Sequence, residues 1–119
     1  MNNSIVQKWF IMLKKIWLEK DIESVKKLLS EKFEYYENPF VQPLTSWSEV
    51  KKAWEEIKNE DILVLEINPL IIKGSEGMAS YDFIYKDLEG KKHQSKGAYY
   101  VRLDSAGRAI EFRRWWVRQ

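Results

Sequence analysis

The hydrophobic pattern changes its period once, near Asp61, and this change limits the folds open to the chain. Before Asp61, apolar side chains recur every three or four residues, which is typical of amphipathic helices. After it, apolar and polar residues alternate in long runs separated by turns that contain Gly90 and Gly107, which is typical of antiparallel strands. Helices followed by hairpins predict the α+β class. A length of 119 residues is enough for one core, so we expect a single domain over residues 1–119.

Three helices are predicted in the first half. The first covers residues 4–20, the second follows an N-cap at Asp21, and the third begins at a capping box in which Ser46 precedes Glu49 by three residues. The first helix also has the pattern of a membrane-surface helix, but a core-facing helix is the favoured interpretation. The predicted buried positions are Ile5, Trp9, Met12, Leu13, Ile16 and Trp17, then Ile22, Val25, Leu28 and Leu29, then Val50, Ala53, Trp54 and Ile57.

Strands are predicted over residues 35–38, 62–73, 78–86, 92–103 and 108–118. Pro39 ends the first because proline has no N–H to donate, and Pro69 indicates a bulge or an edge in the second. Aromatic residues occur on both faces of the hairpins, which predicts a curved sheet with helices on its concave face and a second copy of the chain on its convex face. The expected convex patch consists of Tyr81, Phe83, Tyr85, Tyr100 and Trp115.

The composition argues against several classes of function. The 20 basic residues are interleaved with 18 acidic ones, so we expect no nucleic-acid partner. The chain has no cysteine and His93 is its only histidine, which excludes cysteine-based and histidine-rich metal sites. We expect no cofactor, because there is no phosphate-binding loop. The N-terminal pattern is not that of a signal peptide and no run is long enough to span a bilayer, so we expect a cytoplasmic protein without a membrane partner.

The order of the predicted elements resembles the NTF2-like superfamily and, within it, the SnoaL-like group of domains. Two helices are followed by a strand that ends in Tyr36-x-Asn38-Pro39, then by a capped helix and by long hairpins. The resemblance covers nearly the whole chain and rests on element order. It implies a cone-shaped α+β barrel in which three N-terminal helices pack on a curved antiparallel sheet. It also implies a pocket at the open end of the cone and a homodimer formed through the convex sheet face.

That superfamily includes ketosteroid isomerases, polyketide cyclases, limonene-epoxide hydrolases, a scytalone dehydratase and many proteins without catalysis. Compared with ketosteroid isomerase, the general base falls at Asn38, the oxyanion-hole tyrosine near Leu13 and its aspartate partner at Tyr99. An amide is not a useful proton acceptor and leucine donates no hydrogen bond, so the isomerase mechanism is not expected here.

Limonene-epoxide hydrolase gives a better match. Tyr36 and Asn38 correspond to its water-holding tyrosine and asparagine, and Asp82 corresponds to its acidic residue in the long hairpin. Ser80 replaces its arginine and Arg114 replaces its second aspartate, so the division of labour between two carboxylates is lost. The resemblance therefore does not predict an epoxide hydrolase.

The expected site is a mostly apolar pocket with convergent polar groups. The candidate catalytic residues are Asp82, Tyr36 and Asn38, and the candidate ligand-binding residues are Tyr99, Arg114, Trp17, Trp54, Leu13, Phe112 and Trp116. Simpler interpretations stay open. Asp82 and Arg114 are also consistent with a structural ion pair, Asn38 with turn formation, and the tryptophans with plain core packing.

Three functions are compatible with this pattern. The first is a module that binds a small, largely apolar or aromatic molecule. The second is a cofactor-free enzyme, such as a hydratase, dehydratase, cyclase or epoxide-hydrolase-like protein, that uses Asp82. The third is a structural or interaction dimer whose cavity is filled by its own tryptophans. Whether the chain catalyses a reaction is left open by the sequence.

Overall fold

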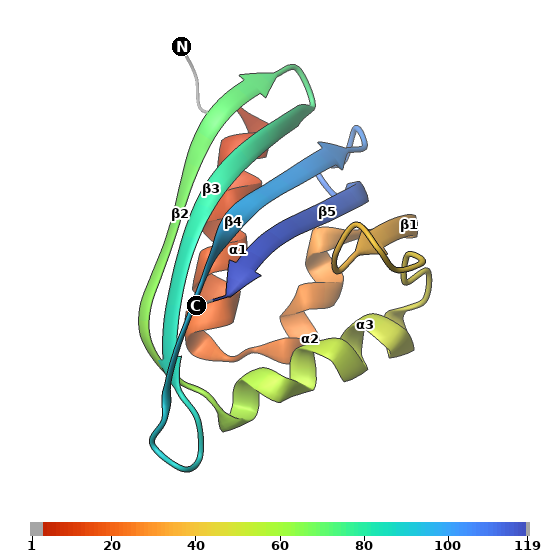
Figure 1. Cartoon of the computed structure of the whole chain (residues 1–119). Helices are drawn as coiled ribbons and strands as arrows, with labels where there is room; N and C mark the ends of the chain where they lie inside the picture. The colour runs from red at the N-terminus through yellow and green to blue at the C-terminus, as the bar shows by residue number, and fades with distance from the viewer. Residues whose placement is uncertain (1–3, 119) are drawn as a thin grey trace.

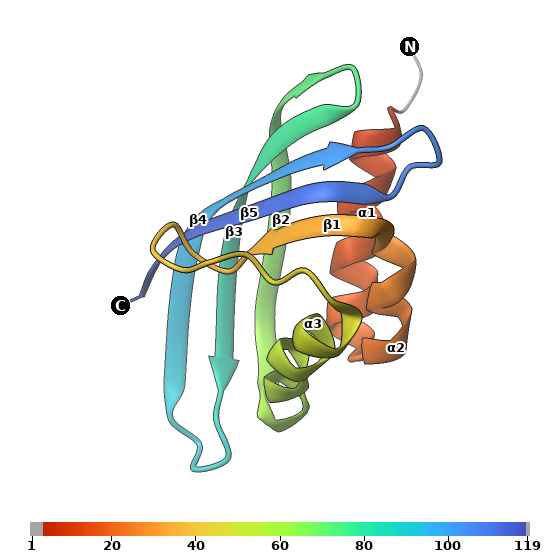
Figure 2. The ribbon, with the colours of Figure 1, turned by 90° about the vertical axis from the view of Figure 1, so that its right-hand side faces the viewer.

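The computed structural model describes residues 4–118. Five strands form one curved sheet in the order β1-β5-β4-β3-β2, and the helices lie against its concave face (Figures 1 and 2). The elements are α1 (Ile5–Glu19), α2 (Ile22–Val25) with a 3-10 turn (Lys26–Leu28), β1 (Leu29–Tyr36), α3 (Trp47–Trp54) with a 3-10 segment (Glu55–Asn59), β2 (Asp61–Lys73), β3 (Glu76–Lys86), β4 (Lys92–Leu103) and β5 (Ala109–Arg118). The predicted α+β class is confirmed.

Two features of the sheet differ from the predicted barrel. β1 pairs with β5 in parallel, so the sheet is mixed rather than purely antiparallel. β1 and β2 are its two edge strands, so the sheet is open rather than closed into a cone. The first difference has a topological reason. Only consecutive strands joined by a tight turn are bound to run antiparallel, and β1 is separated from β5 by α3 and three strands.

The helix ends follow the predicted capping chemistry. Ser4 Oγ accepts a hydrogen bond from the Gln7 N–H at the start of α1, and Lys20 ends that helix in the left-handed conformation, with φ of 54°. At α3 the Glu49 N–H donates to Ser46 Oγ and the Ser46 N–H donates to Glu49 Oε1, which completes the capping box. Within residues 4–118, no helix is both long enough and apolar enough to cross a bilayer.

The first strand lies earlier in the chain than predicted. It begins at Leu29, which was expected in the second helix, and it ends at Tyr36 rather than at residue 38. Phe33 is buried between the exposed Lys32 and Glu34, as expected in a strand, and Leu29 is buried directly after the 3-10 turn. The pairing with β5 shifts its register between Leu29 and Glu34. At the other end the Asn38 side chain accepts a hydrogen bond from the Phe40 N–H at 2.9 Å. This Asx turn takes the chain out of the sheet before Pro39.

The two faces of the hairpins are also assigned differently. Tyr81 and Phe83 are buried on the concave face beside Tyr99, and Asp82 lies on the convex face. The expectation that Tyr81, Phe83 and Tyr85 form part of a convex patch is therefore wrong. Alternation shows which residues of one strand share a face, but it does not show which face is buried when both carry aromatic residues.

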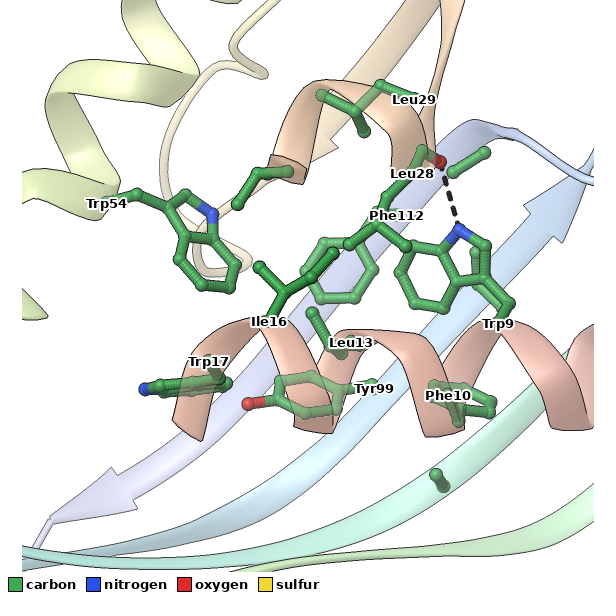
Figure 3. Close-up of a cluster of buried hydrophobic side chains, with 14 of the residues drawn as sticks. Trp9, Phe10, Leu13, Ile16, Trp17, Leu28, Leu29, Trp54, Tyr99 and Phe112 are labelled. Atoms are coloured by element: carbon green, nitrogen blue, oxygen red, sulfur yellow. Dashed lines mark hydrogen bonds between the residues drawn. The ribbon is translucent and has the colours of Figure 1, made fainter. Parts of the chain in front are cut away.

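The core lies between α1 and the concave face of the sheet. Figure 3 shows Trp9, Leu13 and Trp17 projecting from α1 among side chains of the other elements, with the Trp9 indole N–H donating to the Leu28 carbonyl at 2.9 Å. Ile5 and Met12, which were expected to be buried, are exposed, and Val6 and Phe10 are buried instead. The buried stripe of α1 is therefore rotated slightly from the predicted one.

Candidate ligand-binding cavity

A cavity of about 120 Å³ lies between the concave face of the sheet, the C-terminal half of α1 and α3. Its inner wall is mainly aromatic. The Trp17 ring centroid lies 5.4 Å from that of Trp54 and 4.9 Å from that of Phe83. Its outer rim includes the exposed residues Glu56 and Arg118. An engineered apolar cavity of about 150 Å³ binds benzene, so this space is suited to a group the size of one aromatic ring.

Gly97 lies between Tyr81 and Trp116 of the cavity lining, where β4 approaches β5 very closely. A Cβ atom built on Gly97 would lie 1.8 Å from the Trp115 carbonyl oxygen. Only glycine permits this approach of the two backbones, and glycine positions of this kind are where curved sheets bend. Gly97 pairs with Tyr81 of β3 on one side and with Trp116 of β5 on the other, so no side chain lies between these two residues on the concave face. Space for the cavity is therefore left between two large side chains.

Buried polar atoms without partners belong to residues that line the cavity. Among residues 4–118, the buried side-chain polar atoms that lack a hydrogen bond are Trp17 Nε1, Tyr99 OH, Trp116 Nε1 and Glu60 Oε1, and all four residues line this cavity. Other buried polar groups nearby are paired, since the Trp54 indole N–H donates to the Tyr35 hydroxyl at 3.0 Å. Leaving such a group unpaired costs about 1–3 kcal/mol, so its partner is expected to come from outside the chain.

Positive charge lines one side of the cavity. The Arg114 Nε–H donates to the Glu37 main-chain carbonyl at 3.2 Å, and the Arg118 guanidinium lies 5.1 Å from the centre of the Trp116 ring. Of the ion pairs formed within residues 4–118, none includes Arg114 or Arg118. Burial raises the pKa of Tyr99 well above its ordinary value, although the nearby Arg114 opposes this, so its hydroxyl is a neutral donor.

Glu60 is one of three acidic residues that line the cavity, with Glu37 and Glu56. It follows the 3-10 segment and directly precedes β2. Its main-chain N–H donates to the Ile57 carbonyl at 3.1 Å, and its main-chain carbonyl accepts from Lys20 Nζ. Burial, followed by the charge of Glu56, raises the pKa of its carboxyl group to about 7. Its protonation state therefore changes in the neutral range.

All of the residues predicted to bind a ligand line this cavity: Leu13, Trp17, Trp54, Tyr99, Phe112, Arg114 and Trp116. They come from α1, α3, β4 and β5. Figure 3 shows Trp17, Trp54, Tyr99 and Phe112 gathered around α1. The structure brings these side chains together, and their binding role stays a prediction.

The three candidate catalytic residues lie elsewhere, so their expected convergence inside the cone is wrong. Asp82 Oδ1 accepts from Gln94 Nε2 at 3.1 Å on the convex face, which also excludes the alternative ion pair with Arg114. Tyr36 faces away from the cavity because it follows Tyr35, which lines it. Its ring lies 3.9 Å below the Arg113 guanidinium. Asn38 forms the turn described above.

Several cavity residues were not identified from the sequence, among them Glu60, Tyr35 and Arg118. Glu60 is one of 18 acidic residues and carries no motif, and only its position at a helix-to-strand junction next to Ile57 distinguishes it. Tyr35 and Arg118 belong to strands whose aromatic and basic residues occur on both faces, so alternation gave no reason to choose them.

Within residues 4–118 there is no cluster of His, Cys, Asp and Glu suited to holding a metal ion.

No protein-family model matches the chain, and none of the curated proteins matches it by sequence. Similarity does appear among solved structures. SalBIII, an epoxide hydrolase/cyclase-like enzyme of pyran ring formation in the polyether salinomycin, superposes with a TM-score of 0.77 at 11% identity, covering 95% of this chain and 88% of its own. A Mycobacterium tuberculosis protein in complex with estradiol-17β-hemisuccinate superposes with a TM-score of 0.79 at 14% identity, covering 97% and 95%.

An NTF2-like protein of unknown function from Burkholderia pseudomallei gives a TM-score of 0.74 at 15% identity, covering 94% of this chain and 90% of that one. The chain has the NTF2-like fold. The likeness to the NTF2-like fold that the element order indicated is confirmed. Identities of 11–15% establish the fold and no more, so the function has to be argued from the cavity itself.

Proposed function

We propose that this NTF2-like chain binds a small, largely aromatic or apolar molecule that carries a hydrogen-bond acceptor. The observation that carries the proposal is the set of unpaired donors, Trp17 Nε1, Tyr99 OH and Trp116 Nε1, in one aromatic cavity. A cavity with apolar walls and a few converging polar groups is the usual form of a small-molecule site. The M. tuberculosis protein of the same fold, solved with a steroid conjugate, is a precedent for ligand binding by this architecture.

The cavity assigns a role to each part of such a ligand. The ring would lie against Trp17, Trp54 and Phe112, where it gains the free energy of burying apolar area. An acceptor oxygen would receive hydrogen bonds from the indole N–H groups and the Tyr99 hydroxyl, with Arg114 as its electrostatic anchor. A volume of about 120 Å³ limits the buried part to about one ring, so larger ligands would extend past the rim.

The indole N–H resonances test this proposal directly. We expect benzamide, a one-ring molecule with an amide acceptor, to shift the resonances of Trp17 and Trp116 in a titration followed by ¹H–¹⁵N NMR. The Trp9 resonance is an internal control, because its N–H already donates to Leu28. The proposal is contradicted if benzamide and a panel of other one-ring acceptors move no cavity resonance, or move only Trp115 on the convex face.

A matched pair of variants adds a second test. Ala53 lines the cavity, so Ala53→Leu should fill part of it and weaken benzamide binding at least tenfold. Ala98 lies on the convex face, and Ala98→Leu should leave the affinity unchanged. Unchanged binding in Ala53→Leu would contradict the assignment of the site. The same titrations separate a ligand-binding protein from one whose tryptophans fill the cavity, because a filled cavity would not bind benzamide.

An enzymatic function through Asp82, Tyr36 and Asn38 would need these side chains at the cavity, and they lie outside it. Binding is therefore the function that the geometry supports best.

We also propose that the chain works in the cytoplasm, which fractionation of cells that express it would test.

A homodimer through the convex sheet face is a further part of this proposal. Val117 is 76% exposed on this face, Trp115 is exposed beside it, and Phe40 is 95% exposed at the adjoining turn. Apolar side chains grouped in this way mark interaction surfaces. Light scattering should show a dimer at micromolar concentration, and Val117→Lys should shift it towards monomer. A wild-type protein that stays monomeric at that concentration would contradict the dimer.

A further inference from the structure

The cavity combines two kinds of charge that are not paired with each other. Arg114 and Arg118 line it without an ion-pair partner among residues 4–118, and Glu60 Oε1 is buried there without a hydrogen bond. Unpaired guanidinium groups together with indole and phenol donors favour an anionic oxygen ligand. An ionised Glu60 would oppose the same ligand, because like charges repel strongly where water is largely excluded.

The Glu60 carboxyl group is held at the cavity by its own backbone. Its N–H and its carbonyl are both hydrogen bonded, to Ile57 and to Lys20 Nζ, across the junction between α1, the 3-10 segment and β2. Lys20 therefore engages the main chain of Glu60, and none of the ion pairs formed within residues 4–118 includes the Glu60 carboxyl group. This arrangement fixes the backbone at the rim and keeps the side chain available for proton exchange.

Charged groups from each neighbouring element set the protonation of Glu60. Burial makes the largest contribution and raises its pKa, and Glu56 of the 3-10 segment raises it further. Lys20 at the end of α1 and the two arginines of β5, Arg118 and Arg114, lower it. Tyr85 of β3 also faces this group. The balance is a pKa of about 7, so both forms of Glu60 are populated at neutral pH.

We propose that the cavity takes a small aromatic carboxylate and that Glu60 takes up a proton when this anion binds. The inference rests on the proposed ligand-binding function and names its ligand class. The carboxylate would lie at the rim towards Arg114 and Arg118, with its ring between Trp17 and Trp54. The proton comes from solvent, no bond of the ligand is broken, and protonated Glu60 becomes a hydrogen-bond donor to the anion.

Benzoate and its neutral isostere benzamide make the decisive pair of probes. If benzoate binds only the protonated form, the competent fraction falls about tenfold between pH 6 and pH 8, and the apparent affinity falls by the same factor. Benzamide affinity should not change over this range. Calorimetry of benzoate binding at pH 8 in two buffers with different ionisation enthalpies should show uptake of close to one proton.

Two glutamate variants separate the contribution of Glu60 from that of the other ionisable groups. Glu60→Gln should bind benzoate with the same affinity at pH 6 and pH 8, which makes it about tenfold tighter than wild type at pH 8. Glu55→Gln is the matched control, because Glu55 is exposed on the same 3-10 segment and does not line the cavity, and the benzoate affinity of this variant should still fall with pH. Arg114→Gln should weaken benzoate at least tenfold at both pH values while changing benzamide less. The indole spectrum of each variant verifies that the fold is intact.

The outcomes distinguish failure of the proposed binding function from failure of the proton-coupled inference. If neither benzoate nor benzamide binds the wild-type protein at any pH, the proposed function fails. If benzamide binds but benzoate does not, or if the pH dependence of benzoate is absent or persists in Glu60→Gln, the proton-coupled inference is overturned while the binding function stands. Titration of the Glu60 carboxyl by ¹³C NMR in the wild-type protein gives an independent readout, since benzoate should raise its pKa.

Discussion

The two faces of the sheet differ in how completely their polar groups are paired. On the convex face, charged and polar side chains bond to one another. Glu111 accepts from both Arg102 and Arg113, and the Tyr100 hydroxyl donates to Glu76 Oε2 at 2.6 Å. On the concave face, polar atoms of large buried residues are left unpaired in a cavity. A face whose polar groups are mutually satisfied is explained by the fold alone, whereas unpaired buried groups point to a missing partner.

The largest difference between the faces should appear on truncation. Phe112 is 3% exposed and contacts Trp9, Tyr35 and Tyr99, so Phe112→Ala should lower the free energy of unfolding by about 3–5 kcal/mol. Val117 on the convex face of the same strand is its control, and Val117→Ala should cost less than about 1 kcal/mol. Urea denaturation followed by circular dichroism measures both. Equal losses would show that the two faces contribute similarly to the core.

Glu60 and Glu111 should make the stability of the folded protein depend on pH in opposite directions. Glu60 has a raised pKa of about 7, so the folded state holds its proton more tightly and stability should fall as pH rises from about 4.5 to 7. Because Glu60 is only partly buried, screening reduces this loss to about 1–2 kcal/mol. Urea denaturation at several pH values measures it, and Glu60→Gln should abolish it.

Burial would raise the pKa of Glu111, but hydrogen bonds from Arg113 and Arg102 together outweigh burial and lower it. Its contribution is therefore present above the ordinary pKa of a glutamate and is lost as pH falls through the lowered value. Glu111→Gln should thus remove stability at pH 7 and make the acid unfolding less steep. If Glu60→Gln and Glu111→Gln change the pH dependence of stability in the same direction, the predicted opposition between the two glutamates is wrong.

Neighbouring tyrosines provide a finer comparison. The buried Tyr99 hydroxyl has no partner, so Tyr99→Phe should raise the free energy of unfolding by about 1 kcal/mol while weakening benzamide binding. The hydroxyl of Tyr100 is hydrogen bonded, so Tyr100→Phe should lower stability by about 1 kcal/mol and leave binding unchanged. Thermal unfolding with and without benzamide measures both effects. Loss of stability in Tyr99→Phe would show that its hydroxyl is already satisfied in the free protein.

The smallest effect is expected at Asp82. Its carboxylate is 3.9 Å from Lys96 Nζ and contacts Gln94 on the convex face, and such exposed pairs contribute little. Asp82→Asn should change the free energy of unfolding by less than about 0.5 kcal/mol and should not change benzamide or benzoate affinity. A clear loss of ligand affinity in this variant would show that Asp82 contributes to ligand binding after all.

Local sequence signals predicted the elements well, because their chemistry is local. The Ser46–Glu49 capping box, the turns at Gly90 and Gly107 and the irregularity after Pro69 all appear where expected. Errors occurred where a choice depended on distant residues. The parallel pairing of β1 and the open edge at β2 are set by how the helices and the sheet pack, and no local pattern reports this.

The sequence by itself determined the α+β class, the boundaries of most elements and the group of aromatic residues with Arg114 that lines the cavity. Helix caps, turns and the period of hydrophobicity are properties of short segments, so they can be read without the rest of the chain. Only the tertiary structure decided that Asp82 and Tyr36 face outward and that Glu60 faces the cavity. The physical reason is that a face is buried by what packs on it, and the pKa of Glu60 depends on burial and on Glu56, Lys20 and the arginines of β5.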